Sequence, residues 1–182
     1  AMESIGLVEV NSIARGIEAA DAMLKAAQVD LLEAKPVCPG KYIVLICGDV
    51  AAVQSSVTAG KTMAAHSVLD DFILPNVHPQ VLTAISAATP LTLIKALGII
   101  ETFSIASLIV AADTAAKTGQ VDLVEIRIGM GIGGKSFVTL TGDVASVESS
   151  VAAGVMLASE RGMLVDKVVI PSPHDHLKRC LC

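Results

Sequence analysis

Residues 5–9 read IGLVE, and residues 97–101 read LGIIE, a similar apolar stretch that ends in the same glutamate. Three further segments recur in the same order: AADA at 19–22 as AADT at 111–114, GDV at 48–50 and again at 142–144, and LPNVH at 74–78 as IPSPH at 170–174. Chance does not give such collinear matches. The sequence therefore predicts two copies of one small domain, with a first domain and linker over 3–92, a second domain over 95–177 and a tail over 178–182.

Each copy carries apolar runs and helix signals in the order strand, helix, strand, strand, helix, strand. Ser12 and Asp49 are placed to cap the two helices of the first copy, and Ser104 and Asp143 are the corresponding caps in the second. Residues 79–92 predict a short helix and a linker. Four strands with two helices on one face indicate an α/β (α+β) fold of the ferredoxin-like type, which hosts many functions.

The composition favours a protein that buries apolar surface against other proteins. Hydrophobic residues make up 53% of the chain and charged residues 17%, with a mean hydropathy of +0.68. The apolar runs at 42–47 and 105–112 are far shorter than the ~20 residues of a membrane span, and the N-terminus is not typical of a signal peptide. We therefore expect a cytosolic protein with no membrane partner. A net charge of −5 and an aromatic content of 2% argue against nucleic acid as a partner.

The repeated motifs resemble bacterial microcompartment shell domains. The residues that carry this resemblance are LGIIET at 97–102, AAD at 111–113 with Lys117, GDV at 142–144 and IPSPH at 170–174. The resemblance covers nearly the whole chain, once per half. The tandem arrangement, with VCPGK at 37–41 and GIGGK at 131–135, looks most like the iron-sulfur trimeric shell proteins of propanediol-utilisation compartments.

This resemblance implies a structural protein in the shell of a bacterial microcompartment, within the cytoplasm. It implies a homotrimer whose six domains imitate a hexagonal tile, a pseudohexamer, beside other shell proteins and with an encapsulated redox enzyme as a further expected partner. Lys25 and Lys117 match the family's lysine at the tile edge, where the alternative is an ordinary solvated helix lysine. The loop residues that the family turns toward the central pore are Val37, Pro39, Gly40, Gly131, Ile132, Gly133 and Gly134.

Cys38 is the candidate for metal chemistry. It lies in a loop between two strands, and the second copy has Met130 or Gly131 at its place. In the trimer that the resemblance implies, three such thiolates converge on one axis and supply three of the four ligands of a 4Fe-4S cluster. The match to the iron-sulfur shell proteins favours this cluster, which would pass electrons across the shell. An unligated loop cysteine and a zinc thiolate site are the alternatives for the residue, and a metabolite-conducting tile without a cluster is the alternative function.

The other cysteines and the histidines favour structural roles. Cys47 lies inside an apolar strand and is expected in the core. Cys180 and Cys182 are expected in an unordered, reduced terminus rather than in a metal site. The segment His174-Asp175-His176 could hold a metal, but a structural role at a subunit edge is favoured.

The glycine-rich loop at 129–134 imitates a phosphate-binding loop only superficially, because a strand and not a helix follows it. We attribute its glycines to close approach of the backbone around a pore. Paired carboxylates and a nucleophile with its base are not visible, so an enzyme is not expected. A ferredoxin-like regulatory oligomer that binds an effector at subunit clefts is the third possibility.

Overall fold

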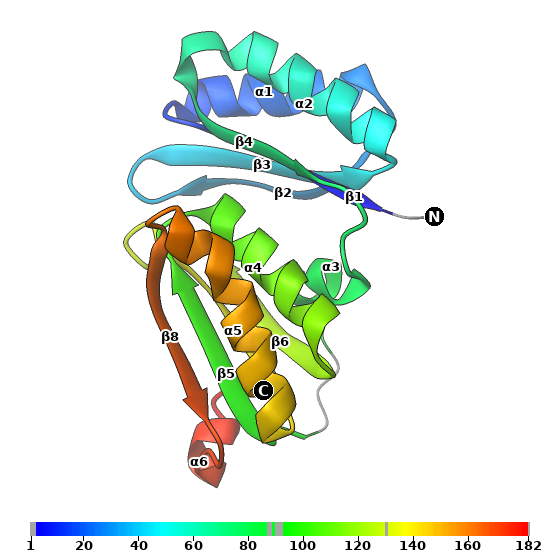
Figure 1. The fold of residues 1–182 in the computed structure, drawn as a ribbon. Helices are drawn as coiled ribbons and strands as arrows, with labels where there is room; N and C mark the ends of the chain where they lie inside the picture. Colours follow the sequence, from blue (N-terminus) through cyan, green and yellow to red (C-terminus); the bar gives the residue numbers. More distant parts are fainter. Residues whose placement is uncertain (1–2, 87–88, 90–92, 130, 182) are drawn as a thin grey trace. The chain divides into compact units, whose positions relative to one another are not determined.

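The computed structural model describes residues 3–86, 89, 93–129 and 131–181. The chain divides into two compact units, Ala1–Val77 and His78–Cys182. Each unit contains one four-stranded antiparallel sheet with its two long helices on one face (Figure 1). The predicted fold class, two tandem ferredoxin-like domains, is confirmed.

The first unit is built in the predicted order of elements. Its sheet has the strand order β2-β3-β1-β4, so that β2 and β4 are the edge strands. The elements are β1 (Ser4–Val10), α1 (Ile13–Ala26), β2 (Asp30–Val37), β3 (Lys41–Gly48), α2 (Val50–Ala64), a short 3-10 turn (Ala65–Ser67) and β4 (Val68–Leu74).

The second unit repeats this order and adds a short helix at each end. Its sheet has the order β6-β7-β5-β8. The elements are α3 (Pro79–Ile85), β5 (Ala96–Thr102), α4 (Ile105–Thr118), β6 (Val121–Ile128), β7 (Ser136–Gly142), α5 (Val144–Glu160), β8 (Leu164–Ile170) and α6 (Asp175–Lys178). We call β1 to β4 the first repeat and β5 to β8 the second repeat.

The sheet register is the same in the two repeats. Val10 of β1 lies opposite Tyr42 of β3, and Thr102 of β5 lies opposite Ser136 of β7. The pairing of the first strand with the last also shifts at the same place, after Glu9 in one repeat and after Glu101 in the other. The residues that match in sequence therefore occupy equivalent places in the fold.

The four long helices begin directly after the predicted cap residues, and three of these residues make the side-chain cap bond. The side chains of Ser12, Ser104 and Asp143 each accept a hydrogen bond from a backbone N–H in the first turn of the helix that follows. Asp49 occupies the same place before α2, but its side chain makes no such bond.

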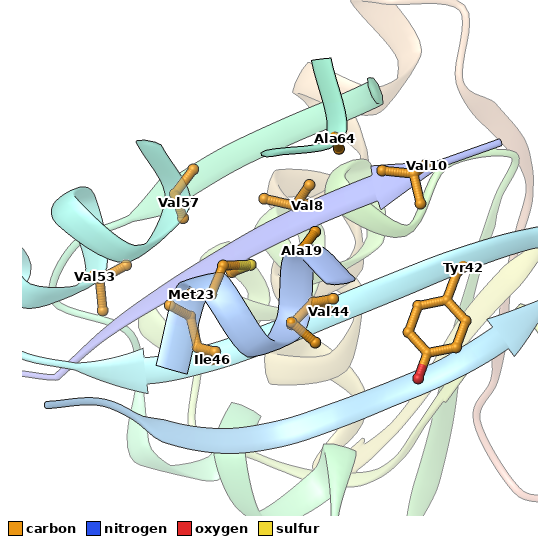
Figure 2. Packing of buried hydrophobic residues seen from close by; sticks show 11 residues of the cluster. Val8, Val10, Ala19, Met23, Tyr42, Val44, Ile46, Val53, Val57 and Ala64 are labelled. Atoms are coloured by element: carbon orange, nitrogen blue, oxygen red, sulfur yellow. The ribbon is translucent and has the colours of Figure 1, made fainter. Parts of the chain in front are cut away.

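The core of the first repeat lies between its sheet and its helix pair (Figure 2). The cluster includes Val8 and Val44 from the sheet, Met23 from α1 and Val53 from α2. Gly60 of α2 lies so close to α1 that a Cβ built there would be 2.6 Å from Met23 Cγ. The small residues of this chain thus allow the two helices to pack closely.

Helix α3, which follows the first repeat, packs within the second unit. Val81 and Ala84 of α3 are fully buried, and α3 packs against β6 and α4. Our prediction grouped residues 3–92 with the first domain, whereas the structure divides the chain after Val77. The reason is the apolar face of α3, which finds its partners on the second repeat.

The chain end also differs from the prediction. Residues 175–178 form α6, and the structure describes the chain through Leu181, whereas we expected an unordered tail from 178. Among the described residues, no helix is both long and apolar enough to cross a membrane.

Candidate functional site

The predicted site residue Cys38 lies at the tip of the β2–β3 hairpin. Val37 and Lys41 are the last paired residues of the two strands, so that Cys38, Pro39 and Gly40 form the whole turn. Gly40 has a φ of 69°, a conformation that side-chain-bearing residues rarely adopt. Cys38 is partly exposed and forms no disulfide. Its thiol is therefore accessible at a tightly defined turn.

Two ion pairs flank this turn. Lys41 Nζ contacts Glu9 Oε1, and Glu9 is almost completely buried in β1. Lys35 Nζ lies 3.3 Å from Glu33 Oε2 on β2. The positive charges nearest to Cys38 in sequence are thus already neutralised by carboxylates of the same sheet.

The second repeat has a longer loop at the same place. Its strands close at Ile128 and Ser136, and within the loop Lys135 N donates to Ile132 O over 3.2 Å. The ion pair of the first repeat recurs between Lys135 Nζ and Glu101 Oε1, at 3.0 Å. Residue 130, one of the two predicted counterparts of Cys38, lies outside the described residues. The two hairpin ends share their charged base and differ in the loop above it.

The glycines of this loop are explained within the chain by its backbone conformation, and their predicted close approach around a pore stays a prediction. Gly129, Gly131, Gly133 and Gly134 all have positive φ, between 59° and 80°. A Cβ built on Gly131 or Gly133 would meet nothing within 4 Å. Within the chain, glycine is therefore required by the backbone conformation, and not by close approach of other atoms.

The residues at the Cys38 turn fit a metal group only if several copies share it. Among the residues that the structure describes, no group of three or more His, Cys, Asp or Glu side chains could hold a metal ion. A thiolate is the ligand type that iron-sulfur clusters and zinc require. A Cβ built on Gly40 would also meet nothing within 4 Å, so the turn is open on that side. One chain supplies one thiolate and free space beside it.

The other cysteines lie apart from this turn. Cys47 is buried in β3 as predicted, and burial raises the pKa of its thiol, with further contributions from Glu3 and Asp30. Cys180 is exposed after α6, and its thiol donates to His176 O over 3.4 Å. Cys182 lies outside the described residues.

The repeated histidines cap the two short helices. His78 Nδ1 accepts from Gln80 N at the start of α3, and His174 Nδ1 accepts from His176 N at the start of α6. The His174 and His176 rings meet edge to face with centroids 5.2 Å apart. Within the chain these histidines cap helices, and a role of His174 at a subunit edge stays a prediction.

The predicted edge lysines form a repeated pair of contacts. Lys25 Nζ lies 2.6 Å from Asp21 Oδ2 on α1, and Lys117 Nζ lies 2.6 Å from Asp113 Oδ2 on α4. Both lysine side chains remain at least 42% exposed. Contact with a neighbouring tile stays a prediction for both.

The sequence analysis missed Gln80, which attaches α3 to the edge strand β6. Gln80 Oε1 accepts from Leu123 N over 2.8 Å, and its Nε2 donates to Val121 O over 3.3 Å. The signal was present in the sequence as the apolar spacing of Val81, Ala84 and Ile85 on a short helix.

A ferredoxin-like unit that occurs twice, with exposed apolar residues on its first helix and a turn cysteine in the first repeat alone, defines a class of tandem-domain proteins. A model of the family described as the BMC domain matches residues 4–77 and 96–173. The chain belongs to the BMC-domain family of bacterial microcompartment shell proteins, with two such domains in tandem.

Relatives match this chain either over nearly its whole length or over less than half of it. It is 44% identical over 177 residues to the bacterial microcompartment shell protein PduT of Citrobacter freundii, covering 97% of this chain and 96% of the relative. The carboxysome shell protein CcmK2 of Synechococcus elongatus is 38% identical over 79 residues, 41% of this chain and 78% of the relative. The shell protein PduA of Citrobacter freundii is 36% identical over 81 residues, 43% of this chain and 87% of the relative. The chain is therefore a structural component of a microcompartment shell.

Proposed function

We propose that this shell protein forms a homotrimeric tile, a pseudohexamer of six BMC domains, that holds a 4Fe-4S cluster on its three-fold axis and transfers electrons across the shell. The observation that carries the proposal is Cys38, an accessible thiol at a hairpin tip in one repeat only. Three chains then present three thiolates at equivalent places, the number that such a cluster needs when its fourth iron takes another ligand.

Each chain contributes more than the thiolate. Gly40 and Lys41 follow Cys38 and Pro39 in the chain, and their backbone N–H groups would be available to donate toward the bound sulfur atoms, whereas Pro39 has no N–H to donate. The buried Glu9 neutralises Lys41, so the turn adds no net positive charge. A bound 4Fe-4S cluster would supply reversible one-electron transfer.

The proposed partners follow from the place of the protein in the microcompartment shell. Other shell proteins surround the tile, and an encapsulated redox enzyme receives or supplies the electrons. Because Cys38 is partly exposed, such a partner can approach a cluster bound at this turn.

The test is anaerobic reconstitution, with iron and sulfide assays and electron paramagnetic resonance. We expect about four irons per three chains and a reducible cluster signal. Cys38→Ser should abolish both, and Cys180→Ser, which changes another accessible cysteine, should leave them intact. Trimers without iron would contradict the cluster, and zinc in place of iron would indicate a redox-silent thiolate site.

A tile with a metabolite-conducting central pore is the second candidate. It is favoured by the loop of the second repeat, where Gly131 and Gly133 offer no side chain to close an opening. Its test is solute flux through tiles reconstituted in a planar film, with Gly133→Trp expected to reduce the flux.

A further inference from the structure

A small cavity lies in the second unit between helix α5 and the edge strand β8, which pack on each other (Figure 1). Its volume is about 220 Å³, below the range of about 300–1,000 Å³ that is typical of sites for drug-sized ligands. The residues that line it are Glu148, Val151 and Ala152 of α5 and Lys167, Val168 and Val169 of β8. These residues belong to neither hairpin loop, so the cavity is separate from the Cys38 turn.

The sheet register places Lys167 on the side of this cavity. Lys167 is the partner of Ile100 in the pairing of β8 with β5, and directly paired residues of an antiparallel sheet have their side chains on the same face. Ile100 is completely buried, and a Cβ built on Gly154 of α5 would lie 2.9 Å from its Cδ1. Lys167 therefore lies on the face of the sheet that α5 covers, at its edge.

Glu148 lines the same cavity from the helix. Val151 and Ala152 follow it by three and four residues, so all three lie on one face of α5. Val151 is buried, whereas Glu148 and Ala152 are exposed. The cavity thus combines apolar valine side chains with a carboxylate from α5 and an ammonium group from β8.

The first repeat has an ion pair at the equivalent place. There Lys61 Nζ of α2 lies 2.9 Å from the Asp71 carboxylate of β4, so the helix and the edge strand are joined directly. The second repeat has the buried Val155 in place of Lys61, and it has Lys167 in place of Asp71. The direct connection of the first repeat is therefore lost in the second.

The two charges of the second repeat do not pair with each other. Glu148 stands where the first repeat has the neutral Gln54, so a carboxylate and an ammonium group line one cavity. Among the ion pairs of the described residues, none includes Glu148 or Lys167. One acceptor and one donor of opposite charge are thus available to a ligand.

We propose that this cavity binds a small zwitterion of the amino acid class, with one ammonium group, one carboxylate and an apolar body. The ammonium group of the ligand donates to Glu148, its carboxylate accepts from Lys167, and its apolar body lies on Val151 and Val169. Hydrogen bonds between charged groups are stronger than neutral ones, and one at each end fixes the orientation of the ligand. The inference rests on neither the proposed trimer nor the proposed cluster.

The test is a titration of the full, assembled protein with valine, followed by NMR of the labelled methyl groups of its valine residues. We expect the Val151 and Val169 signals to shift with a Kd of about 1 mM. The isomer 5-aminopentanoate carries the same charges further apart, and binding of either isomer supports the proposal. The analogue 3-methylbutanoate lacks the ammonium group and 2-methylpropylamine lacks the carboxylate, so each should bind at least about tenfold more weakly.

Variants show which residues hold the ligand. Lys167→Gln and Glu148→Gln each remove one charge from an exposed side chain, so each should keep the far-ultraviolet spectrum of the fold and weaken zwitterion binding at least about tenfold. Ala152→Phe should fill the cavity and abolish binding. The matched control is Thr58→Phe on α2, the exposed counterpart of Ala152 in the first repeat, which should leave binding intact.

Several results would overturn the proposal. One is equal binding of the zwitterions and their single-charge analogues, and another is no shift of either valine signal at about 100 mM ligand, ~100 times the expected Kd. Unchanged binding in Lys167→Gln, in Glu148→Gln or in Ala152→Phe would do the same. Loss of the cluster in Cys38→Ser should leave zwitterion binding intact, so this site and the proposed function fail separately.

Discussion

The two repeats share a backbone and a register but differ in what covers their first helix. In the second repeat α3 packs against α4, whose apolar residues are buried, whereas Ile13, Ile17 and Leu24 of α1 in the first repeat are exposed. The aspartates at equivalent places of the two helices also differ in exposure. The Asp113 side chain is 6% exposed, and the Asp21 side chain is 62% exposed. The duplicated chain therefore contains the same helix face twice, buried in the second repeat and exposed in the first.

A second difference lies under the helices. A Cβ on Gly16 of α1 would lie 2.5 Å from Tyr42 Cβ, so glycine is needed for the aromatic ring to fit. The second repeat has Leu108 and Ser136 at the equivalent places, both completely buried. One repeat fills the space from the sheet and the other from the helix, which shows that the fold specifies a volume and not a residue.

The largest effect is expected from Gly16→Leu, which gives the first repeat the helix residue of the second without its partner. The clash involves Tyr42 Cβ and the near edge of its ring, which cannot swing away. We expect a loss of about 3 kcal/mol in the free energy of unfolding, at the upper end for overpacked cores. Urea denaturation followed by circular dichroism measures it.

The control is the double variant Gly16→Leu with Tyr42→Ser, which reproduces the pair Leu108 and Ser136. It should be more stable than Gly16→Leu alone. Additive losses from the two changes would show that the repeats do not exchange volume at this place.

The next effect is that of Ile85→Ala on α3, compared with Leu181→Ala after α6. Ile85 is buried within the second unit, so its truncation should cost about 2 kcal/mol at any protein concentration. Leu181, at the corresponding place after α6, is only partly buried, so Leu181→Ala should cost clearly less. Urea denaturation followed by circular dichroism measures both losses, and equal losses would contradict the difference in burial.

A smaller effect is expected from the aspartates of α1 and α4. Asp113→Ala leaves the N–H of His78 without its acceptor and removes the Lys117 contact, at a cost of about 1–2 kcal/mol. Asp21→Ala removes only an exposed contact with Lys25, worth about 0.3–0.5 kcal/mol. Chemical denaturation of each variant measures both losses, and equal losses would contradict the burial difference.

The smallest effect concerns the caps of α2 and α5. Hydrogen bonds from Ser146 N and Oγ lower the pKa of the Asp143 carboxyl, whereas Asp49 makes no side-chain cap bond. A lowered folded-state pKa adds stability above the unfolded-state value, and this is lost as pH falls through the folded-state pKa. Asp143→Asn should therefore be less stable than wild type near neutral pH and equal to it in strong acid. Acid titrations followed by circular dichroism test this, with Asp49→Asn as the control, and a difference that persists in acid would refute it.

Much of the fold could be predicted because its signals are local. Ser12, Ser104 and Asp143 are capping residues directly before apolar periodic stretches, and the structure begins helices at each. The boundary after Val77 could not be predicted, because the apolar spacing of α3 shows that the helix has a buried face but does not show which repeat buries it.

Part of the candidate site could likewise be predicted from the sequence, and part could not. The position of Cys38 in a turn followed from Pro39 and Gly40, which punctuate the chain locally. The conformational reason for the glycines at 129–134 did not, because a positive φ and a close contact leave the same glycine in a sequence.

The sequence by itself determined that the chain is a duplicated BMC-domain protein, and that one repeat alone carries a turn cysteine. Only the tertiary structure decided that α3 packs within the second unit while Ile13, Ile17 and Leu24 on the corresponding helix of the first repeat stay exposed. The physical reason is that periodicity records the apolar face of each helix, whereas the surface that covers it comes from residues distant in sequence.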